Sequence, residues 1–256
     1  VTIEGSLLIA NLYKFVNGGW FALLLASFYF LLMFGWYFGR KIKNRYITFA
    51  NLNKYADLFR DLVKDDSVPK TATNLVYIIR ANRKDQVESK VIYSIFQKQP
   101  KRADKYWLIH VDRVNDPNQF NYQVTQIIPD ILIRIDFHIG FKVEPKINLY
   151  FRKVIEDLTG SGEIKLESGY DSLKKYNVAG DFKFILIERI MPRDFKLSNI
   201  ENFILTLHNL AGKLNITDIV SFQLDATNTV IEQVPILIDQ PSHQRIKRME
   251  ITNNRL

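Results

Sequence analysis

The sequence carries no charged side chain at residues 15–39, a stretch rich in Leu, Phe, Trp and Tyr. A helix of this length rises about 37 Å, and the hydrocarbon core of a bilayer is about 30 Å thick. Trp20 lies near one end and Trp36 near the other, at the headgroup level that amphipathic rings prefer. The pattern predicts a transmembrane helix. A buried helix of a soluble protein would rarely stay free of charge for so long, and a cleaved signal peptide would have a shorter apolar core.

Four cations follow this stretch at once, at Arg40, Lys41, Lys43 and Arg45. They mark a membrane junction. By the positive-inside rule, the end of the helix that carries them is cytoplasmic, so we expect residues 40–256 to lie in the cytoplasm. Residues 1–14 are too short to span a bilayer alone, and we expect them to end a preceding membrane segment or to form a connecting loop. Because the chain begins with Val and its first Met is Met33, we expect it to be the C-terminal part of a longer protein.

Beyond the junction, strand and helix patterns alternate along the sequence. Residues 46–63 place apolar side chains at helical spacing, so residues 40–63 are predicted to be a basic junction and an amphipathic linker helix. Further helices are predicted at residues 85–98, 147–159 and 199–214, and strands at 74–81, 106–114, 122–128, 131–141, 182–190, 219–225 and 229–238. This alternation predicts an α/β domain over residues 64–239 with a mixed, mainly parallel sheet, followed by a basic tail at residues 240–256.

Two of these segments also predict which side chains face the core. Along residues 131–141, apolar positions alternate with Arg134, Asp136 and His138, so we expect one buried face and one face toward solvent or a partner. If this strand lies at a sheet edge, it can pair with a second copy in a homodimer; plain solvent exposure explains the pattern equally well. For residues 199–214, helical spacing predicts an inward stripe of Ile200, Phe203, Leu207, Leu210 and Leu214.

Composition narrows the classes of partner. The chain has 256 residues, a formal net charge of +8 and no cysteine. Disulfides and thiolate metal sites are therefore excluded within it, and a reducing compartment fits. In a membrane protein the basic balance serves attraction to the anionic inner leaflet, so we expect the lipid bilayer and no nucleic acid as a partner.

Polar residues at the ends of predicted strands form a candidate site for a nucleotide or another anion. Ligands of open α/β sheets bind near the carboxyl ends of strands. The residues that follow the first two strands are Arg80, Asn82, Arg83, Asp112 and Arg113. Polar residues that lead into the first strand are Lys70, Thr71 and Asn74, and a basic loop around Pro100 contains Lys101 and Arg102. A solvated charge run is the more common explanation of such a basic loop, and no Gly-rich phosphate loop accompanies these residues.

The sequence contains no recognisable catalytic constellation. Its histidines lack the spacing of a metal site, and Ser94 and Ser221 lack the context of a nucleophile elbow. We therefore expect no enzyme activity, no metal and no cofactor.

Several strings resemble the KUP (KUP/HAK/KT) family of potassium transporters. LLIANLYKFVNGGWFALLL (7–25) resembles the start of the last membrane helix of that family, and VPKTATNLVY (68–77) resembles the approach to its first cytoplasmic strand. The longest matching strings are KVIYSIFQKQPKRADKYWLIHVD (90–112) and FKVEPKINLYFRKVIEDL (141–158), followed in order by DFKFILIERI (181–190) and VIEQVPI (230–236). The resemblance therefore covers nearly the whole chain.

The resemblance implies a multi-helix cell-membrane protein that imports potassium together with protons. On this template, the chain is the last membrane helix and the cytoplasmic domain, and its partners are the remainder of the membrane domain and a second copy. The domain would control transport through dimerisation or through a nucleotide. Cyclic di-AMP is the candidate by analogy with other potassium systems of Gram-positive bacteria. Two alternatives remain open: a structural domain without a ligand, and a membrane-anchored enzyme or signalling domain.

Overall fold

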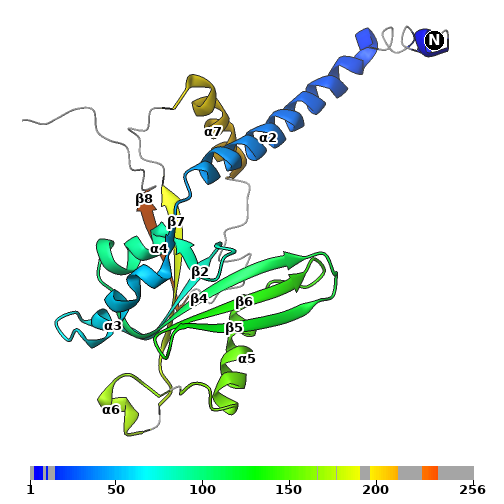
Figure 1. Cartoon of the computed structure of the whole chain (residues 1–256). Helices are drawn as coiled ribbons and strands as arrows, with labels where there is room; N and C mark the ends of the chain where they lie inside the picture. Colours follow the sequence, from blue (N-terminus) through cyan, green and yellow to red (C-terminus); the bar gives the residue numbers. More distant parts are fainter. Residues whose placement is uncertain are drawn as a thin grey trace, which may run out of the picture.

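A long helix projects from an α/β domain in the computed structural model, which describes residues 3–7, 10, 15–165, 167–176, 178–190, 197–212 and 227–235 (Figure 1). A π-helical turn, η1 (Phe15–Gly19), leads into this helix, α2 (Trp20–Arg45). Of the helices in the described part, α2 is the one long and apolar enough to cross a membrane. Within its most apolar 18 residues, 6% of the positions are buried. The predicted helix is therefore present, and it continues through the basic junction to Arg45.

A six-stranded sheet forms the centre of the α/β domain. Its strands are β2 (Lys70–Ile79), β4 (Arg102–Val114), β5 (Phe120–Ile128), β6 (Leu132–Gly140), β7 (Phe182–Ile190) and β8 (Thr229–Pro235). They lie in the order β5-β6-β4-β2-β7-β8, with β5 antiparallel to β6 and the other neighbours parallel. The mixed, mainly parallel sheet confirms the predicted fold class. The predicted strand at residues 219–225 and the tail at 240–256 lie outside the described residues.

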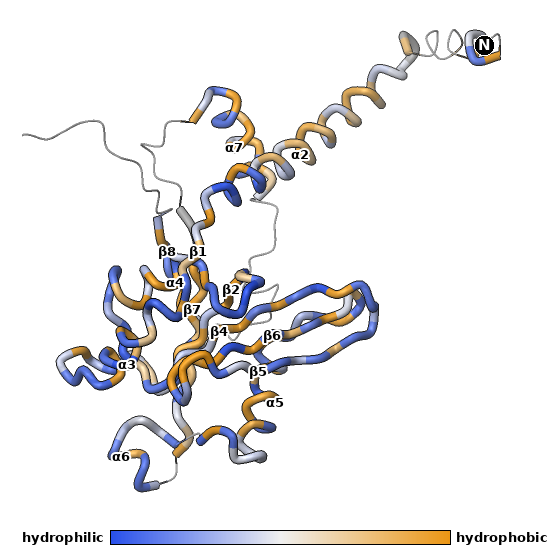
Figure 2. Tube along the Cα trace, viewed as in Figure 1, coloured by the Kyte–Doolittle hydropathy of each residue, from blue (hydrophilic) through white to orange (hydrophobic). Residues whose placement is uncertain are grey.

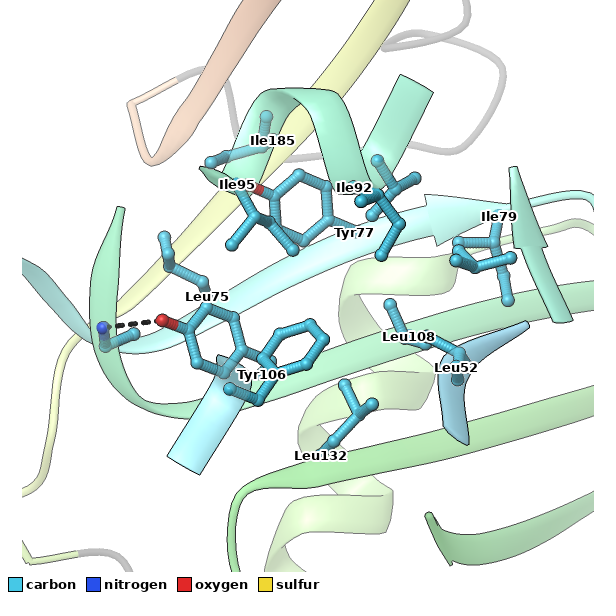
Figure 3. Close-up of a cluster of buried hydrophobic side chains, with 14 of the residues drawn as sticks. Leu52, Leu75, Tyr77, Ile79, Ile92, Ile95, Tyr106, Leu108, Leu132 and Ile185 are labelled. Atoms are coloured by element: carbon cyan, nitrogen blue, oxygen red, sulfur yellow. Dashed lines mark hydrogen bonds between the residues drawn. The ribbon is translucent and has the colours of Figure 1, made fainter. Parts of the chain in front are cut away.

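Helices cover both faces of the sheet. On one face lie α3 (Ala56–Lys64) and α4 (Ser89–Ile92), which continues as the π-helical segment η3 (Tyr93–Lys98). Tyr77, Ile95 and Tyr106 meet in the core beneath them (Figure 3). On the other face, α5 (Ile147–Gly160) packs Phe151 edge-on against Trp107, which is fully buried. A short helix, α6 (Asp171–Lys174), follows α5 in the chain.

The predicted linker helix over residues 46–63 is wrong in its first half. This segment begins as a short strand, β1 (Phe49–Asn51), paired antiparallel with β3 (Gln86–Glu88), which also occupies the start of the predicted helix at 85–98. The Asn51 side chain then accepts a hydrogen bond from the backbone N–H of Asn53 at 2.9 Å. This cap starts a new helical segment, η2 (Leu52–Tyr55), from which α3 continues. The helical spacing of the apolar residues therefore did not reveal the break.

The prediction of a wet face on residues 131–141 is also wrong. Strand β6 lies between β4 and β5, so it is not a sheet edge, and Arg134 is fully buried. The Arg134 guanidinium donates to the carbonyl oxygens of Arg83 at 2.6 Å and Ala81 at 2.7 Å. It also donates from Nε and Nη2 to Asp136 at 2.9 and 2.7 Å. Because every charged atom has a partner, this polar stripe can be buried instead of facing water.

Helix α7 (Asn199–Gly212) packs against α2 rather than against the sheet. Its buried side chains are Ile204, Leu205 and His208, whereas three residues of the predicted inward stripe, Ile200, Phe203 and Leu210, are exposed; Leu214 lies outside the described residues. A Cβ added to Gly35 of α2 would lie 2.5 Å from Leu207 Cβ, and one added to Gly39 would lie 2.4 Å from His208 Cβ. The groove at these two glycines therefore selects the face of α7 that is buried, which the sequence of α7 alone could not indicate.

The buried pair of Arg134 and Asp136 leads to a prediction about stability. Burial acts to raise the pKa of Asp136, but hydrogen bonds from His110 and Arg134 outweigh it and hold this pKa below its usual value. Asp136→Asn is expected to lower the free energy of unfolding by about 3 kcal/mol at neutral pH, because a buried cation loses its counter-charge. Urea unfolding of the full-length protein in detergent, followed by tryptophan fluorescence, measures this loss.

The control is Asp112→Asn, which removes a half-exposed carboxylate and should change stability little. The stabilisation from Asp136 is present above the pKa of an unfolded aspartate, about 3.9, and disappears as the pH falls through the lower folded-state value. The difference between wild type and Asp136→Asn should therefore shrink below about pH 4. Equal stability of the two proteins at pH 7 would contradict this account.

Candidate ligand-binding site

The first hollow lies at the carboxyl ends of β2, β4 and β6. It has a volume of about 190 Å³ and is lined by Asn82, Lys84, His110, Asp112, Gln123, Asp136 and His138. The register places His110 opposite Asp136 and Asp112 opposite His138, so that residues far apart in the chain meet here. We call this region the carboxyl-edge hollow.

The polar side chains of the carboxyl-edge hollow contact one another. His110 Nδ1 lies 3.2 Å from Asp136 Oδ1, and His138 Nδ1 lies 3.4 Å from Asp112 Oδ2. Lys84 donates to the amide oxygen of Gln123 at 2.9 Å. Two carboxylates therefore face one lysine and two histidines, which offers a phosphate group little net attraction.

The second hollow lies at the amino ends of β2 and β4, beside the segment that precedes α6. It has a volume of about 330 Å³ and is lined by Lys70, Thr73, Asn74, Asp104, Lys105, Lys165, Glu167, Ser168, Gly169, Asp171 and Lys174. Four lysines thus face three carboxylates around one opening. We call this region the amino-edge hollow.

A network of hydrogen bonds fixes the wall of the amino-edge hollow. The carboxylate of Asp181 accepts from the backbone N–H of Thr73 at 2.8 Å and from its hydroxyl at 2.6 Å. Lys70 Nζ donates to the carbonyl oxygen of Gly169 at 2.7 Å and lies 2.7 Å from Asp104 Oδ1. A Cβ on Gly169 would meet Asp104 Oδ2 at 1.8 Å, so any larger residue here would require the Asp104 side chain to move. The wall is therefore preorganised before any ligand enters.

Two cations of the amino-edge hollow stay available to a ligand. Among the described residues, Lys105 and Lys165 form no ion pair, whereas Lys174 pairs with Glu167 at 3.4 Å. The ring of Tyr170 lies 5.5 Å from Lys70 Nζ, at the same end of the sheet. The hollow thus combines free ammonium groups with a neighbouring aromatic ring, a combination that suits a phosphate attached to a base.

The residues proposed from the sequence do not form one site. Lys70 and Asn74 line the amino-edge hollow, while Asn82 and Asp112 line the carboxyl-edge hollow at the opposite end of the strands. Thr71 lies on β2 but lines neither hollow. The division arises because Lys70 and Asn74 belong to the first half of β2, whereas Asn82 follows its carboxyl end and Asp112 lies near the carboxyl end of β4.

Three arginines lie near the carboxyl ends of the strands, Arg113 on β4 and Arg80 and Arg83 in the loop after β2. Arg113 donates to the carbonyl oxygens of Gly140 at 3.1 Å and Val143 at 3.0 Å. Arg83 Nε lies 3.4 Å from Asp85 Oδ1, and the backbone N–H of Arg80 donates to Glu88. None of the three lines the carboxyl-edge hollow.

Lys101 and Arg102 connect elements of the fold instead of lining either hollow. Lys101 is buried and donates from Nζ to Ser94 O at 2.5 Å and to Glu232 Oε1 at 3.1 Å. Burial lowers the pKa of Lys101, against the raising effect of Glu232. Arg102 donates to the carbonyl oxygen of Val63 at 3.2 Å and pairs with Asp66, beyond the end of α3. Lys101 therefore ties η3 to β8, and Arg102 ties β4 to the segment after α3.

Sequence reasoning missed most of the amino-edge hollow. Lys165, Ser168 and Gly169 belong to a polar, Gly-containing stretch without periodicity, and Asp104 follows the basic loop, on β4. The glycine was the available signal, because Gly169 lies where a side chain would collide with Asp104. In the carboxyl-edge hollow, the alternation of Asp136 and His138 on β6 was visible, but their pairing with β4 was not.

The four cations of the membrane junction occupy the last turns of α2. Arg40 and Lys41 are exposed. Lys43 Nζ lies 3.4 Å from Asn209 Oδ1, and Arg45 Nη1 lies 3.2 Å from Glu201 Oε1, both on α7. The junction therefore contacts α7 through its second half.

Comparison with known proteins assigns these regions to one family. The profile of the K+ potassium transporter C-terminal domain matches residues 72–233, and that of the K+ potassium transporter integral membrane domain matches residues 1–41. The two matches follow one another along the chain and flank the segment that contains β1, η2 and α3. No solved structure matches the chain.

Curated relatives match along nearly the whole chain. It is 42% identical to the probable potassium transport system protein Kup of Cytophaga hutchinsonii over 247 residues, 96% of this chain and 38% of the relative. It is 40% identical to the protein of the same name from Flavobacterium psychrophilum, over 98% of this chain and 38% of the relative. The Clostridium perfringens protein is 31% identical over 97% of this chain and 37% of the relative. The chain thus spans less than half the length of these relatives. It belongs to the K+ potassium transporter family and carries its C-terminal domain together with the end of its integral membrane domain.

Proposed function

We propose that this chain is the last membrane helix and the cytoplasmic control domain of a potassium importer of the KUP type. The observation that carries the proposal is the succession of the two family matches across α2 and the α/β domain. The relatives named as potassium transport proteins support it over nearly the full length of this chain. Transport of potassium with protons is part of the proposal and rests on the family resemblance.

The proposed orientation places the α/β domain in the cytoplasm of a multi-pass membrane protein. Arg40, Lys41, Lys43 and Arg45 stand at the end of α2 that joins this domain, and cations favour the cytoplasmic side. The ion pathway would then lie among helices outside this chain. The described residues would contribute assembly and regulation.

The domain would act as a homodimer. In the described sheet, β5 and β8 are the edges, so these strands rather than β6 are available to pair with a second copy. Val230 and Ile231 on β8 are 43% and 44% exposed, which gives this edge apolar side chains that a partner can cover.

A regulatory nucleotide such as cyclic di-AMP would bind in the amino-edge hollow. Lys105 and Lys165, which form no ion pair among the described residues, would contact its phosphates, and Tyr170, whose ring lies 5.5 Å from Lys70 Nζ, would stack on a base. The carboxyl-edge hollow is smaller, and its two carboxylates oppose an anion. A ligand controls transport only if it binds one conformation of the transporter better than another.

The transport proposal predicts uptake by the full-length protein. Its expression should restore growth at low potassium to a bacterial strain without potassium uptake systems, and a protonophore should abolish the uptake. Failure of a well-expressed protein to restore growth would contradict the proposal. Deletion of residues 46–256 separates two roles of the domain: normal assembly with unregulated uptake supports regulation, and loss of assembled protein supports a purely structural role.

The ligand proposal predicts saturable heat when cyclic di-AMP is titrated into the purified full-length protein. Lys105→Gln and Lys165→Gln should each weaken binding about tenfold, because a hydrogen bond to a charged group contributes about 1.5 kcal/mol. The matched control, Lys84→Gln in the carboxyl-edge hollow, should bind like wild type. Calorimetry with a panel of nucleotides measures both effects.

Absence of heat with every nucleotide would remove the ligand from the proposal while leaving transport untouched. A loss confined to Lys84→Gln would move the site to the carboxyl-edge hollow. Native mass spectrometry of the same samples tests assembly: twice the mass of one full-length polypeptide is expected, and the mass of a single polypeptide would contradict the homodimer.

A further inference from the structure

Helix α7 has three distinct faces around its axis. Ile204, Leu205 and His208 form the face buried against α2. A second face carries exposed polar side chains, Asn199, Asn202, Thr206 and Asn209. Between them lies an apolar stripe of Ile200, Phe203 and Leu210, which are 71%, 57% and 54% exposed. At 100° per residue, these three side chains fall on one side of the helix. We call this set the α7 stripe.

The contact with α2 is close and involves the apolar part of that helix. Gly35 and Gly39 lie against Leu207 and His208, at distances that would not admit a Cβ. The ring of His208 stacks on Trp36 with 4.9 Å between centroids. Residues 35–39 belong to the charge-free stretch, so this part of α7 lies beside membrane-spanning sequence rather than beyond it.

The position along α2 sets the depth of α7. Gly35 precedes Arg40 by five residues, which corresponds to about 7.5 Å along the helix axis. Amphipathic helices that lie in a membrane surface bury their apolar face by about 5–10 Å. Leu207, which contacts Gly35, therefore lies at the depth expected for the apolar side of such a helix.

The charges around α7 suit the same location. Arg45 pairs with Glu201 near the start of α7, and Lys43 contacts Asn209. Arg40 and Lys41 remain exposed beside them, at the level where anionic lipid headgroups attract cations. Figure 2 shows hydrophobic positions continuing from α2 onto the neighbouring α7. The apolar side chains thus match the acyl-chain region of a bilayer, and the polar and basic side chains match its headgroup region.

We propose that α7 is an interfacial membrane helix whose stripe inserts among the lipid acyl chains of the leaflet that faces the α/β domain. The polar face then points toward headgroups and water, and Gly35 and Gly39 fix the helix against α2. Since α7 lies between β7 and β8 in the chain, this insertion would give the chain a second point of attachment to the membrane besides α2.

Site-specific fluorescence quenching tests the proposal on the full-length protein in vesicles of phosphatidylethanolamine and phosphatidylglycerol. This chain has no cysteine, so single cysteines introduced here can be labelled once any elsewhere in the protein are replaced. The probe NBD is attached at Phe203→Cys and Leu210→Cys in the stripe. Controls are Asn202→Cys and Thr206→Cys on the polar face, and Leu149→Cys on α5, which is 46% exposed.

Lipids with a shallow doxyl group are expected to quench most of the fluorescence at positions 203 and 210, while aqueous iodide leaves it nearly unchanged. The control positions should show the reverse. Quenching of positions 203 and 210 by iodide, as strong as at position 149, would overturn the proposal because the stripe would face water. Protection from both quenchers would also overturn it, since another membrane helix or a second copy would then cover the stripe.

Discussion

The close approach of α7 to α2 at Gly35 and Gly39 decides which face of α7 is buried. Without side chains at these positions, Leu207 and His208 reach the backbone of α2, and no other residue type would leave that space. The contact extends to Ile42, which packs with Ile204 and Leu205. An element from late in the chain is thereby fixed to the helix at its start.

Several buried charges of the domain are paired with one another. Arg134 and Asp136 bind one another and nearby carbonyl oxygens, which lets β6 be buried on both faces. Lys101 and Glu232 do the same between η3 and β8. Lys105 and Lys165 are different, because they face an open hollow without a counter-charge of their own. This contrast between satisfied and available cations points to the amino-edge hollow as the place for an anion.

The sequence predicted the strands well because period-two and continuous apolar patterns are local properties. It predicted faces and sites less well, because these depend on neighbours that are remote in the chain. The burial of α7 was wrong since the glycines that receive it lie far upstream in α2. The polar face of β6 was wrong since its partners come from the loop that contains Ala81 and Arg83. The candidate site was split between two edges because it combined residues from the start of β2 with residues that follow its carboxyl end.

Photo-crosslinking tests the contact between α2 and α7 most directly. Benzoylphenylalanine replaces Phe38, which packs against the cluster of Ile42, Ile204 and Leu205, in the full-length protein in its membrane. The same probe at the preceding residue, Tyr37, which is 63% exposed, serves as the control. Mass spectrometry should identify crosslinks from position 38 to peptides of residues 199–212, and no such crosslinks from position 37. Crosslinks from position 38 only to lipid or to other segments would contradict the account.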